Sequence, residues 1–358
     1  LHLYTNLPNT SMKRPPLHIK ILMIILSSII LFFLFIFIIE YKPRRVKTIY
    51  SSEANDPLPD SIKILCWNIG YGGLGENMDF FYDGGCRVRD SKERTIENLS
   101  QIVNLIRRED ADIVLLQEVD RCSKRTYNID QLELLRKEFP EYHLYFAYNY
   151  NSLFVPKPLR EPIGKVKSGV VILTKYIPEE VIRYQYPSKF PFPISAFNLK
   201  RCLLTASFIT QNGKRIIIGN THNTAYDTGN MRAEEINFLS DKFQEYTINR
   251  TPFVIGGDWN QYPPEYNPSK EELNGSEFVT IQLDDTQLSQ YADIHYDKQN
   301  KTLRHLNIPY SDSSVLTVTD YFMTSKGLST NNCEVIPLDF ENSDHNPVRI
   351  SIYLRTWR

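Results

Sequence analysis

The stretch Thr251-Pro252-Phe253-Val254-Ile255-Gly256-Gly257-Asp258-Trp259-Asn260 says most about how this chain folds. Its β-prone, apolar first half predicts a short buried strand, and two glycines lead from that strand into a carboxylate and an amide. The ends of neighbouring strands share one edge of a sheet, so polar side chains placed there can meet others that are distant in sequence. The segment therefore predicts a sheet-based protein with a polar site at the edge of the sheet.

The same arrangement recurs along the chain. The predicted buried strand 112–118 ends in a carboxylate, and the β-prone run 62–67 ends before an amide. Further polar residues follow the predicted strand 215–220 and precede the closing strand 347–354. The residues gathered in this way are Asn68, Glu118, His222, Asp258, Asn260, Asp344 and His345. Oxygen ligands together with two histidines indicate a site for a hard cation next to a general base.

The remaining elements predict a mixed α/β domain. Apolar residues recur at helical spacing in residues 91–108, and residues 129–139 and 229–246 are also predicted helices. Residues 169–174, 199–209 and 315–323 are predicted strands, whereas the polar residues 261–314 are predicted loops. Several strands are apolar throughout, which is typical of sheets covered on both faces.

The N-terminal part of the sequence contains a run, residues 21–39, without a single charge. As a helix it would be roughly 28 Å long, enough to cross the core of a bilayer. A cleaved signal peptide is the main alternative, but no small-residue cleavage site follows the run. We therefore expect residues 1–20 to be a basic N-terminal segment, 21–39 a single transmembrane helix or uncleaved signal anchor, and 40–60 a linker. Residues 61–358 are expected to be a catalytic domain on the exported side of the membrane.

Charge and cysteine content narrow the classes of function. Residues 1–50 carry seven Lys or Arg and one Glu, so the remaining residues have a net charge of −7. An acidic domain argues against broad binding to the nucleic-acid backbone. The five cysteines form no C-x-x-C pattern, which argues against a zinc site. A disulfide between Cys86 and Cys122 stays an option for an exported domain.

Six short motifs occur in an order that resembles the endonuclease/exonuclease/phosphatase (DNase I-like) superfamily. They are Trp67-Asn68, Gln117-Glu118, Thr221-His222, Gly257-Asp258-Trp259-Asn260, Asp320-Tyr321-Phe322 and Ser343-Asp344-His345, and the resemblance spans roughly residues 60–356. It implies a four-layer α/β sandwich, in which helices flank two packed mixed β-sheets.

The resemblance also implies a role for each residue. Glu118, Asn68 and Asp344 would hold Mg²⁺, with Mn²⁺ as an alternative, and the metal would polarise a phosphoryl oxygen. His345 would take a proton from the attacking water, and Asp320 would orient its ring. Asp258 and Asn260 would align the nucleophile and bind phosphate, and His222 would donate to a phosphate oxygen.

The chain departs from the superfamily pattern at two places. Gly70 stands where many members have an acidic residue, which weakens the interpretation as an abasic-site nuclease. The loop 76–85 is outside the shared pattern, and it either packs as a lid or contacts substrate. The basic residues Arg121, Lys124 and Arg125 follow Glu118 closely and either face solvent or clamp a phosphate.

Three functions fit these observations. We favour a metal-dependent phosphoesterase acting on small or lipid phosphoesters near a membrane, to which residues 21–39 would attach it. A membrane-anchored nuclease is the second hypothesis, although nucleic acid is the less favoured substrate. The third is a catalytically silent binding protein, against which the complete set of acid, amide and histidine residues argues. No feature of the sequence indicates an oligomeric state.

Overall fold

The computed structural model describes residues 16–54, 56–227, 229–274 and 280–354, which belong to two separate units. The first unit, residues 1–40, contains helix α1 (Leu17–Ile39), which has 23 residues. Its mean hydropathy reaches 3.2, and it is long and apolar enough to cross a membrane. The expected helix over residues 21–39 is therefore present, and it begins four residues earlier, at Leu17. Residues 1–15 of the expected basic N-terminal segment lie outside the described residues.

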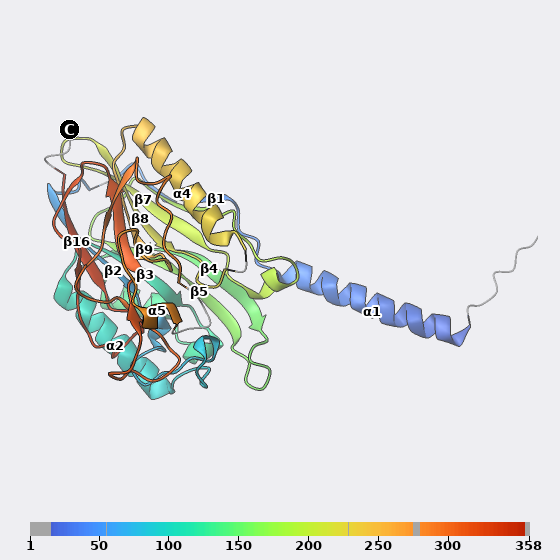
Figure 1. Cartoon of the computed structure of the whole chain (residues 1–358). Coiled ribbons are helices and arrows are strands. Elements are labelled where there is room, and N and C mark those ends of the chain that lie inside the picture. The colour runs from blue at the N-terminus through green and yellow to red at the C-terminus, as the bar shows by residue number, and fades with distance from the viewer. Residues whose placement is uncertain (1–15, 55, 228, 275–279, 355–358) are drawn as a thin grey trace, which may run out of the picture. The chain divides into compact units, whose positions relative to one another are not determined.

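The second unit, residues 41–358, is built on two large β-sheets (Figure 1). Sheet 1 has the strand order β1 (Val46–Ser51), β6 (Glu180–Gln185), β7 (Cys202–Ile209), β8 (Arg215–His222), β9 (Phe253–Asp258), β13 (Asp320–Ser325) and β10 (Ala292–His295). Sheet 2 has the order β14 (Ser329–Thr330), β16 (Val348–Tyr353), β2 (Ser61–Asn68), β3 (Ile113–Asp120), β5 (Gly164–Thr174) and β4 (His143–Val155), and β15 (Glu334–Val335) also pairs with β16. A two-stranded ladder joins β11 (Leu303–Arg304) to β12 (Leu316–Thr317).

Each large sheet contains one parallel pair of strands joined by a helix. In sheet 2, α2 (Lys92–Glu109) connects β2 to the parallel strand β3. In sheet 1, α4 (Met231–Ile248) connects β8 to the parallel strand β9. Both pairs end in polar residues, namely Asn68 and Glu118 near the ends of β2 and β3, and His222 and Asp258 at the ends of β8 and β9. The carboxyl ends of such parallel strands are where open α/β sheets bind ligands.

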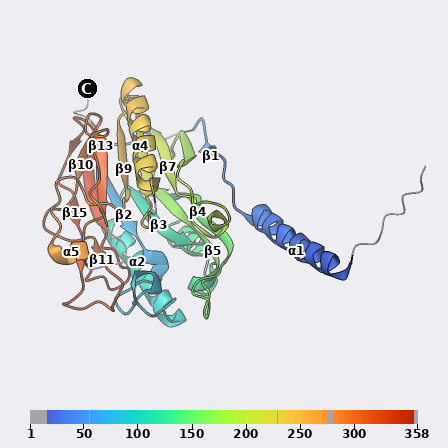
Figure 2. The same cartoon turned by 45° about the vertical axis from the view of Figure 1, so that its right-hand side comes forward.

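The core divides into three apolar layers, which make the domain a four-layer sandwich. The central layer packs Ile64 and Leu115 of sheet 2 against Leu204 and Val254 of sheet 1. A second layer packs α2 and α3 (Gln131–Glu138) on the outer face of sheet 2, and a third packs α4 on the outer face of sheet 1. Figure 2 shows α4 and α2 as two of these covering helices. The expected fold class, an α/β sandwich of two mixed sheets flanked by helices, is confirmed.

The helix boundaries follow from local capping chemistry. The Ser91 side chain accepts a hydrogen bond from the Arg94 amide at 3.1 Å and begins α2, and the Asp130 carboxylate accepts from the amides of Leu132 and Glu133 and begins α3. Short 3₁₀ helices occupy Gly70–Gly72, Phe81–Asp83, Lys124–Thr126 and Ile194–Phe197, labelled η1 to η4.

Three expectations about the chain need correction. The expected linker 40–60 contains β1, whose residues pair antiparallel with β6, so the folded unit begins at Tyr41 rather than residue 61. The expected loop region 261–314 contains α5 (Lys270–Asn274), β10 and β11. The disulfide between Cys86 and Cys122, which the sequence left as an option, is absent, and both residues are free cysteines.

Candidate active site

Eight of the predicted site residues come together where the two sheets meet. Sheet 2 contributes Asn68 and Glu118 from its parallel pair, and Asp344 and His345 from the turn that precedes β16. Sheet 1 contributes His222, Asp258 and Asp320, and Asn260 lies two residues after the end of β9. Because each sheet supplies four of the eight, the cluster exists only where the two sheets are packed together.

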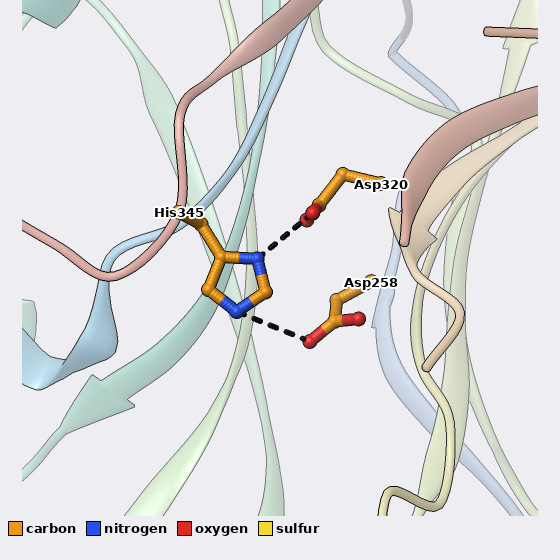
Figure 3. Close-up of side chains that lie close together, drawn as sticks. All are labelled: Asp258, Asp320 and His345. Atoms are coloured by element: carbon orange, nitrogen blue, oxygen red, sulfur yellow. Dashed lines mark hydrogen bonds and ion pairs between the residues drawn. The ribbon is translucent and has the colours of Figure 1, made fainter. Parts of the chain in front are cut away.

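The centre of the cluster is the pair His345 and Asp320. Nδ1 of His345 lies 2.8 Å from Oδ2 of Asp320, and both residues are buried (Figure 3). The His345 backbone is held as well, since its carbonyl accepts from the indole nitrogen of Trp67 at 2.8 Å. Thr319 donates to the same Asp320 oxygen at 3.1 Å. These contacts hold Nδ1 against the carboxylate and turn Nε2 of His345 toward Asp258.

Asp258 links the other members of the cluster through its two oxygens. Oδ2 of Asp258 accepts from the Asn68 amide at 3.0 Å and lies 3.4 Å from Nε2 of His222 and 3.7 Å from Nε2 of His345. Oδ1 accepts from the backbone amide of Asn260 at 3.0 Å. Burial raises the pKa of Asp258 to about 6. One carboxylate therefore contacts or approaches groups from both sheets.

The two histidines have opposite electrostatic surroundings. Burial opposes the cation of His345, but the carboxylates of Asp320, Asp258 and Asp344 outweigh it and raise its pKa well above the usual value. Burial lowers the pKa of His222 well below the usual value, and the charge of Arg201 lowers it further. His222 is therefore a neutral imidazole near neutral pH, whereas His345 readily holds a proton.

Glu118, Asp344 and Asn68 are the three oxygen donors predicted to hold a metal ion, and the charge of Glu118 acts on Asp344. Glu118 has a φ of 57°, and the pairing of β3 with β5 is irregular between Leu116 and Val119, which aims the Glu118 side chain out of the strand. Burial raises the pKa of Asp344 to about 7, and the negative charge of Glu118 raises it further. A divalent cation beside these oxygens would relieve this repulsion, so the donor set fits a hard metal ion.

A second group of potential ligands, Asp258, Asp320 and His345, also places its atoms within 4.8 Å of one another. Nδ1 of His345 and Oδ2 of Asp320 are already engaged with each other, so this group acts first as a hydrogen-bonded pair next to a carboxylate. The oxygen-only set of Glu118, Asp344 and Asn68 therefore suits Mg²⁺ better.

The structure gives a physical reason for the glycine at position 70. Gly70 has a φ of +48°, and a Cβ at this position would lie 2.7 Å from Oδ1 of Asp344. Its amide donates to Oδ1 of Asn68 at 3.0 Å. An acidic side chain at this position would therefore collide with Asp344, which occupies the space beside Asn68.

The three basic residues predicted to bind substrate do not share one environment. Arg121 pairs with Asp130 at 3.1 Å, and its guanidinium lies over the ring of Phe146. Arg125 is buried, pairs with Asp120 at 2.9 Å and lies 4.0 Å from Glu118. Lys124 is exposed and has no ion pair within the described part of the chain. The charges of the two arginines are thus already balanced by protein carboxylates.

Arg201 is a member of the cluster that sequence reasoning missed. It is buried, donates from Nη1 to the backbone carbonyl of His222 at 3.3 Å, and forms no ion pair with any residue the structure describes. Its charge acts on Glu118 and Asp258. The only sequence signal was the pair Lys200-Arg201 near the start of the predicted strand 199–209, which gives no indication that this arginine points inward.

The loop 76–85 also reaches the cluster. Asp83 accepts a hydrogen bond from the Tyr226 hydroxyl at 3.1 Å, and the rings of Tyr82 and Tyr226 lie 6.0 Å apart. Burial raises the pKa of Asp83 to about 6, and the charge of Glu118 raises it further. The loop therefore places a carboxylate within electrostatic range of the proposed metal ligands, in addition to packing.

Comparison with solved structures shows the same fold in several proteins. An endonuclease/exonuclease/phosphatase from Beutenbergia cavernae DSM 12333 is 17% identical, with 82% of this chain and 72% of that chain covered and a TM-score of 0.55. A family protein from Leptotrichia buccalis C-1013-b is 16% identical, with coverage of 81% and 99% and a TM-score of 0.53. ANGEL2, a 2′,3′-cyclic phosphatase, is 16% identical, with coverage of 87% and 99% and a TM-score of 0.51.

Sequence comparison identifies the family directly. No curated protein matches the sequence. The family model for the endonuclease/exonuclease/phosphatase family matches residues 65–345, which contain all eight residues of the cluster. The match covers well over half of the chain, and the solved structures share its fold. The chain therefore belongs to the endonuclease/exonuclease/phosphatase family.

Proposed function

We propose that this chain is a metal-dependent hydrolase of phosphoester bonds that works next to a membrane. The observation that carries the proposal is the buried pair of His345 and Asp320, in which the second imidazole nitrogen, Nε2, lies 3.4 Å from the Asn68 amide nitrogen and 3.7 Å from Oδ2 of Asp258. A histidine held by a carboxylate on one nitrogen can exchange a proton on the other.

In this proposal Nε2 of His345 takes a proton from the attacking water. Asp320 holds the ring in the required orientation and stabilises the imidazolium that results. The carboxylates of Asp258 and Asp344 also favour the protonated ring. A bound cation and substrate groups would balance the negative charge of Asp344 and Asp258. The pKa of His345 would then fall closer to that of a working base.

Glu118, Asp344 and the amide oxygen of Asn68 are the residues that would hold Mg²⁺ or Mn²⁺. When bound, the ion would polarise a phosphoryl oxygen and offset charge on the leaving oxygen. Burial raises the pKa of Asp344 to about 7, so metal binding and loss of its proton would be coupled. Asp258 and Asn260 would align the nucleophile, since they are fixed to each other by the bond from the Asn260 amide.

His222 and Arg201 would stabilise negative charge on the phosphoryl group. His222 is held neutral, so it can donate one hydrogen bond without carrying a full charge. Arg201 holds the backbone of His222 and adds a buried positive charge behind it. Both groups are fixed before substrate arrives, which is the condition under which such donors are most effective.

Small or lipid phosphoesters are the proposed substrates. The acidic balance of the folded unit disfavours long nucleic acids. Helix α1 would anchor the protein as a single-pass membrane protein, and we propose that the catalytic unit lies on the exported side. An anchored enzyme meets lipid substrates at high local concentration, which favours a phosphoester within or close to the bilayer.

The test is a comparison of substrates with the full chain in detergent. Phospholipids, sugar phosphates and short single-stranded and double-stranded nucleic acids are incubated with Mg²⁺, and released products are measured against the His345→Ala variant. Release from phospholipids or sugar phosphates that the variant lacks supports the proposal. Release from nucleic acids alone would favour the nuclease hypothesis, and no release from any substrate would favour a binding protein.

A further inference from the structure

The catalytic unit carries exposed apolar side chains that are concentrated on two neighbouring segments. Leu159 is 89% exposed, and Leu153, Phe154, Phe192 and Ile194 are between 46% and 55% exposed. We call these five residues the apolar rim. The other large exposed apolar residues of this unit are scattered singly, as is normal on a protein surface. A cluster of this kind marks an interaction surface.

The two segments of the apolar rim are joined to each other. The first is the connection between β4 and β5, which projects from the end of sheet 2 (Figure 1). The second contains η4, which packs beside β4. The hydroxyl of Tyr150 donates to the carbonyl of Phe197 at 2.8 Å, and that of Ser152 to the carbonyl of Ala196 at 3.3 Å. The rim is thus one surface held on a rigid strand.

Positive charge surrounds the apolar rim. Lys157, Arg160 and Lys189 are exposed and form no ion pair with described residues. The only acidic residue in the connection between β4 and β5 is Glu161, which is paired with Arg89 at 2.7 Å. Apolar and aromatic tips flanked by unbalanced Lys and Arg are the chemistry of a surface that enters the headgroup region of an anionic bilayer.

Only a short segment of chain connects the proposed anchor to the strand that carries part of this surface. Helix α1 ends at Ile39, and the ring of Tyr41 already contacts the ring of Tyr148 on β4, at a centroid distance of 6.3 Å. Two residues of chain reach at most about 7 Å. Along the same strand, the five residues from Tyr148 to Leu153 span roughly 16 Å. If α1 spans a bilayer, β4 cannot be far from its surface.

The base of the rim packs against segments that follow Asn68 and Glu118 in the chain. Val155 and Ile163, which flank the tip of the connection, pack in one cluster with Tyr71 and Phe80. The same connection meets the segment after Glu118, because a Cβ on Gly164 would lie 2.6 Å from the Lys124 side chain. A membrane in contact with the rim would therefore lie on the side of the domain where the segments after Asn68 and Glu118 run.

We propose that the apolar rim inserts into the interfacial region of the membrane that holds α1, with anionic phospholipid as its ligand. The rim would keep the catalytic unit against the bilayer and present its active site to phosphoesters at the surface. The inference rests on the proposed membrane anchor, but it does not require any particular hydrolysed substrate. A second protein as the occupant of the rim is the outcome that would overturn it.

The experiment uses the full chain reconstituted into vesicles whose acyl chains carry bromine, which quenches nearby tryptophan. Leu159→Trp and Ile194→Trp each place a probe on one segment of the rim. Ile248→Trp is the matched control, because Ile248 is an exposed apolar residue at the end of α4, outside the rim. All probes are placed in a Trp357→Phe background, and emission is compared with that of this background, whose remaining tryptophans, Trp67 and Trp259, are fully buried.

We expect both rim probes to be blue-shifted and quenched in vesicles that contain phosphatidylglycerol, and the Ile248→Trp probe to be unaffected. Quenching should decrease with salt and in a Lys157→Glu/Arg160→Glu background. Absence of quenching at both rim probes, or a blue shift already present in dilute detergent and unchanged by lipid, would overturn the proposal. Failure of the anchor itself is separate, since it would appear as release of the chain from membranes.

Discussion

Gln117 and Asn220 meet across the two sheets, with Nε2 of Gln117 donating to Oδ1 of Asn220 at 2.7 Å. The Asn220 amide in turn donates to the carbonyls of Leu116 at 2.9 Å and Val171 at 2.7 Å. Gln117 directly precedes Glu118, and Asn220 lies two residues before His222. This fully buried network therefore fixes the distance between groups that the two sheets contribute to the site.

Asn220→Ala should lower the free energy of unfolding by about 1–3 kcal/mol, because it removes buried hydrogen bonds with the carbonyls of Leu116 and Val171 and with the Gln117 amide. Chemical denaturation measures this change. Asn249→Ala is the control, since Asn249 is exposed at the end of α4 and should change stability by less than about 0.5 kcal/mol. Equal stability of the two variants would contradict the proposed role of the network.

His345→Ala should lower kcat by about 10²–10⁴-fold, the usual contribution of positioned proton transfer. Asp320→Asn should also lower kcat, because an amide cannot stabilise the imidazolium and can select the wrong tautomer. The loss in the double variant should be close to that of His345→Ala alone, since Asp320 would have no ring left to orient. The measurement is kcat at saturating metal; multiplicative losses would show that the two residues act independently.

Removal of metal with a chelator should abolish activity, and Mg²⁺ or Mn²⁺ should restore it, because the proposed ligands are oxygens. Glu118→Gln should shift the metal titration to much higher Mg²⁺ concentration. Activity measured against metal concentration separates this effect from that of His345→Ala, which should leave the midpoint nearly unchanged. Full activity in excess chelator would disprove the metal assignment.

Arg201→Gln should lower kcat by about 10²–10³-fold, the magnitude observed when one preorganised donor to a developing negative charge is removed. Arg121→Gln is the matched control, because its charge is already paired with Asp130. The melting temperatures of both variants are measured as well, and kcat is determined well below the lower of the two. A similar loss in the two variants would mean that Arg201 acts only by its general charge, not by its position behind His222.

The full chain should remain with membranes after alkaline extraction, since α1 has the length and hydropathy of a spanning helix. A chain that lacks residues 21–39 should be released by the same treatment. Fractionation followed by immunodetection with an N-terminal tag measures both. Release of the full-length chain with its tag intact would refute the anchor.

Sequence patterns predicted the central strands of the sheets better than the edge strands. Apolar runs such as 62–67 and 112–118 lie at the centre of sheet 2, where burial on both faces leaves a continuous signal. Edge strands were missed: β4 alternates tyrosines with polar residues, and β1 is short and largely exposed. Their pairing depends on partners distant in sequence, which local patterns do not contain.

The polar residues of the candidate site were predicted from the sequence, but the charged groups that act on them were not. Asp258 and His345 were placed by their positions next to strands, because strand ends share an edge. The inward direction of Arg201 and the approach of Asp83 to Glu118 depend on how loops fold over that edge. Likewise, the partners of Arg121 and Arg125 are Asp130 and Asp120, and which acid neutralises which base is decided only by the fold.

The path of the chain through the sandwich sets the order in which the protein can mature. Sheet 2 begins with β2, is left after β5, and is completed only when β16 inserts next to β2. Asp344 and His345 lie three to four residues before that strand. A ribosome must therefore synthesise almost the entire domain before the proposed proton-accepting residue and the central strand β16 can join the fold.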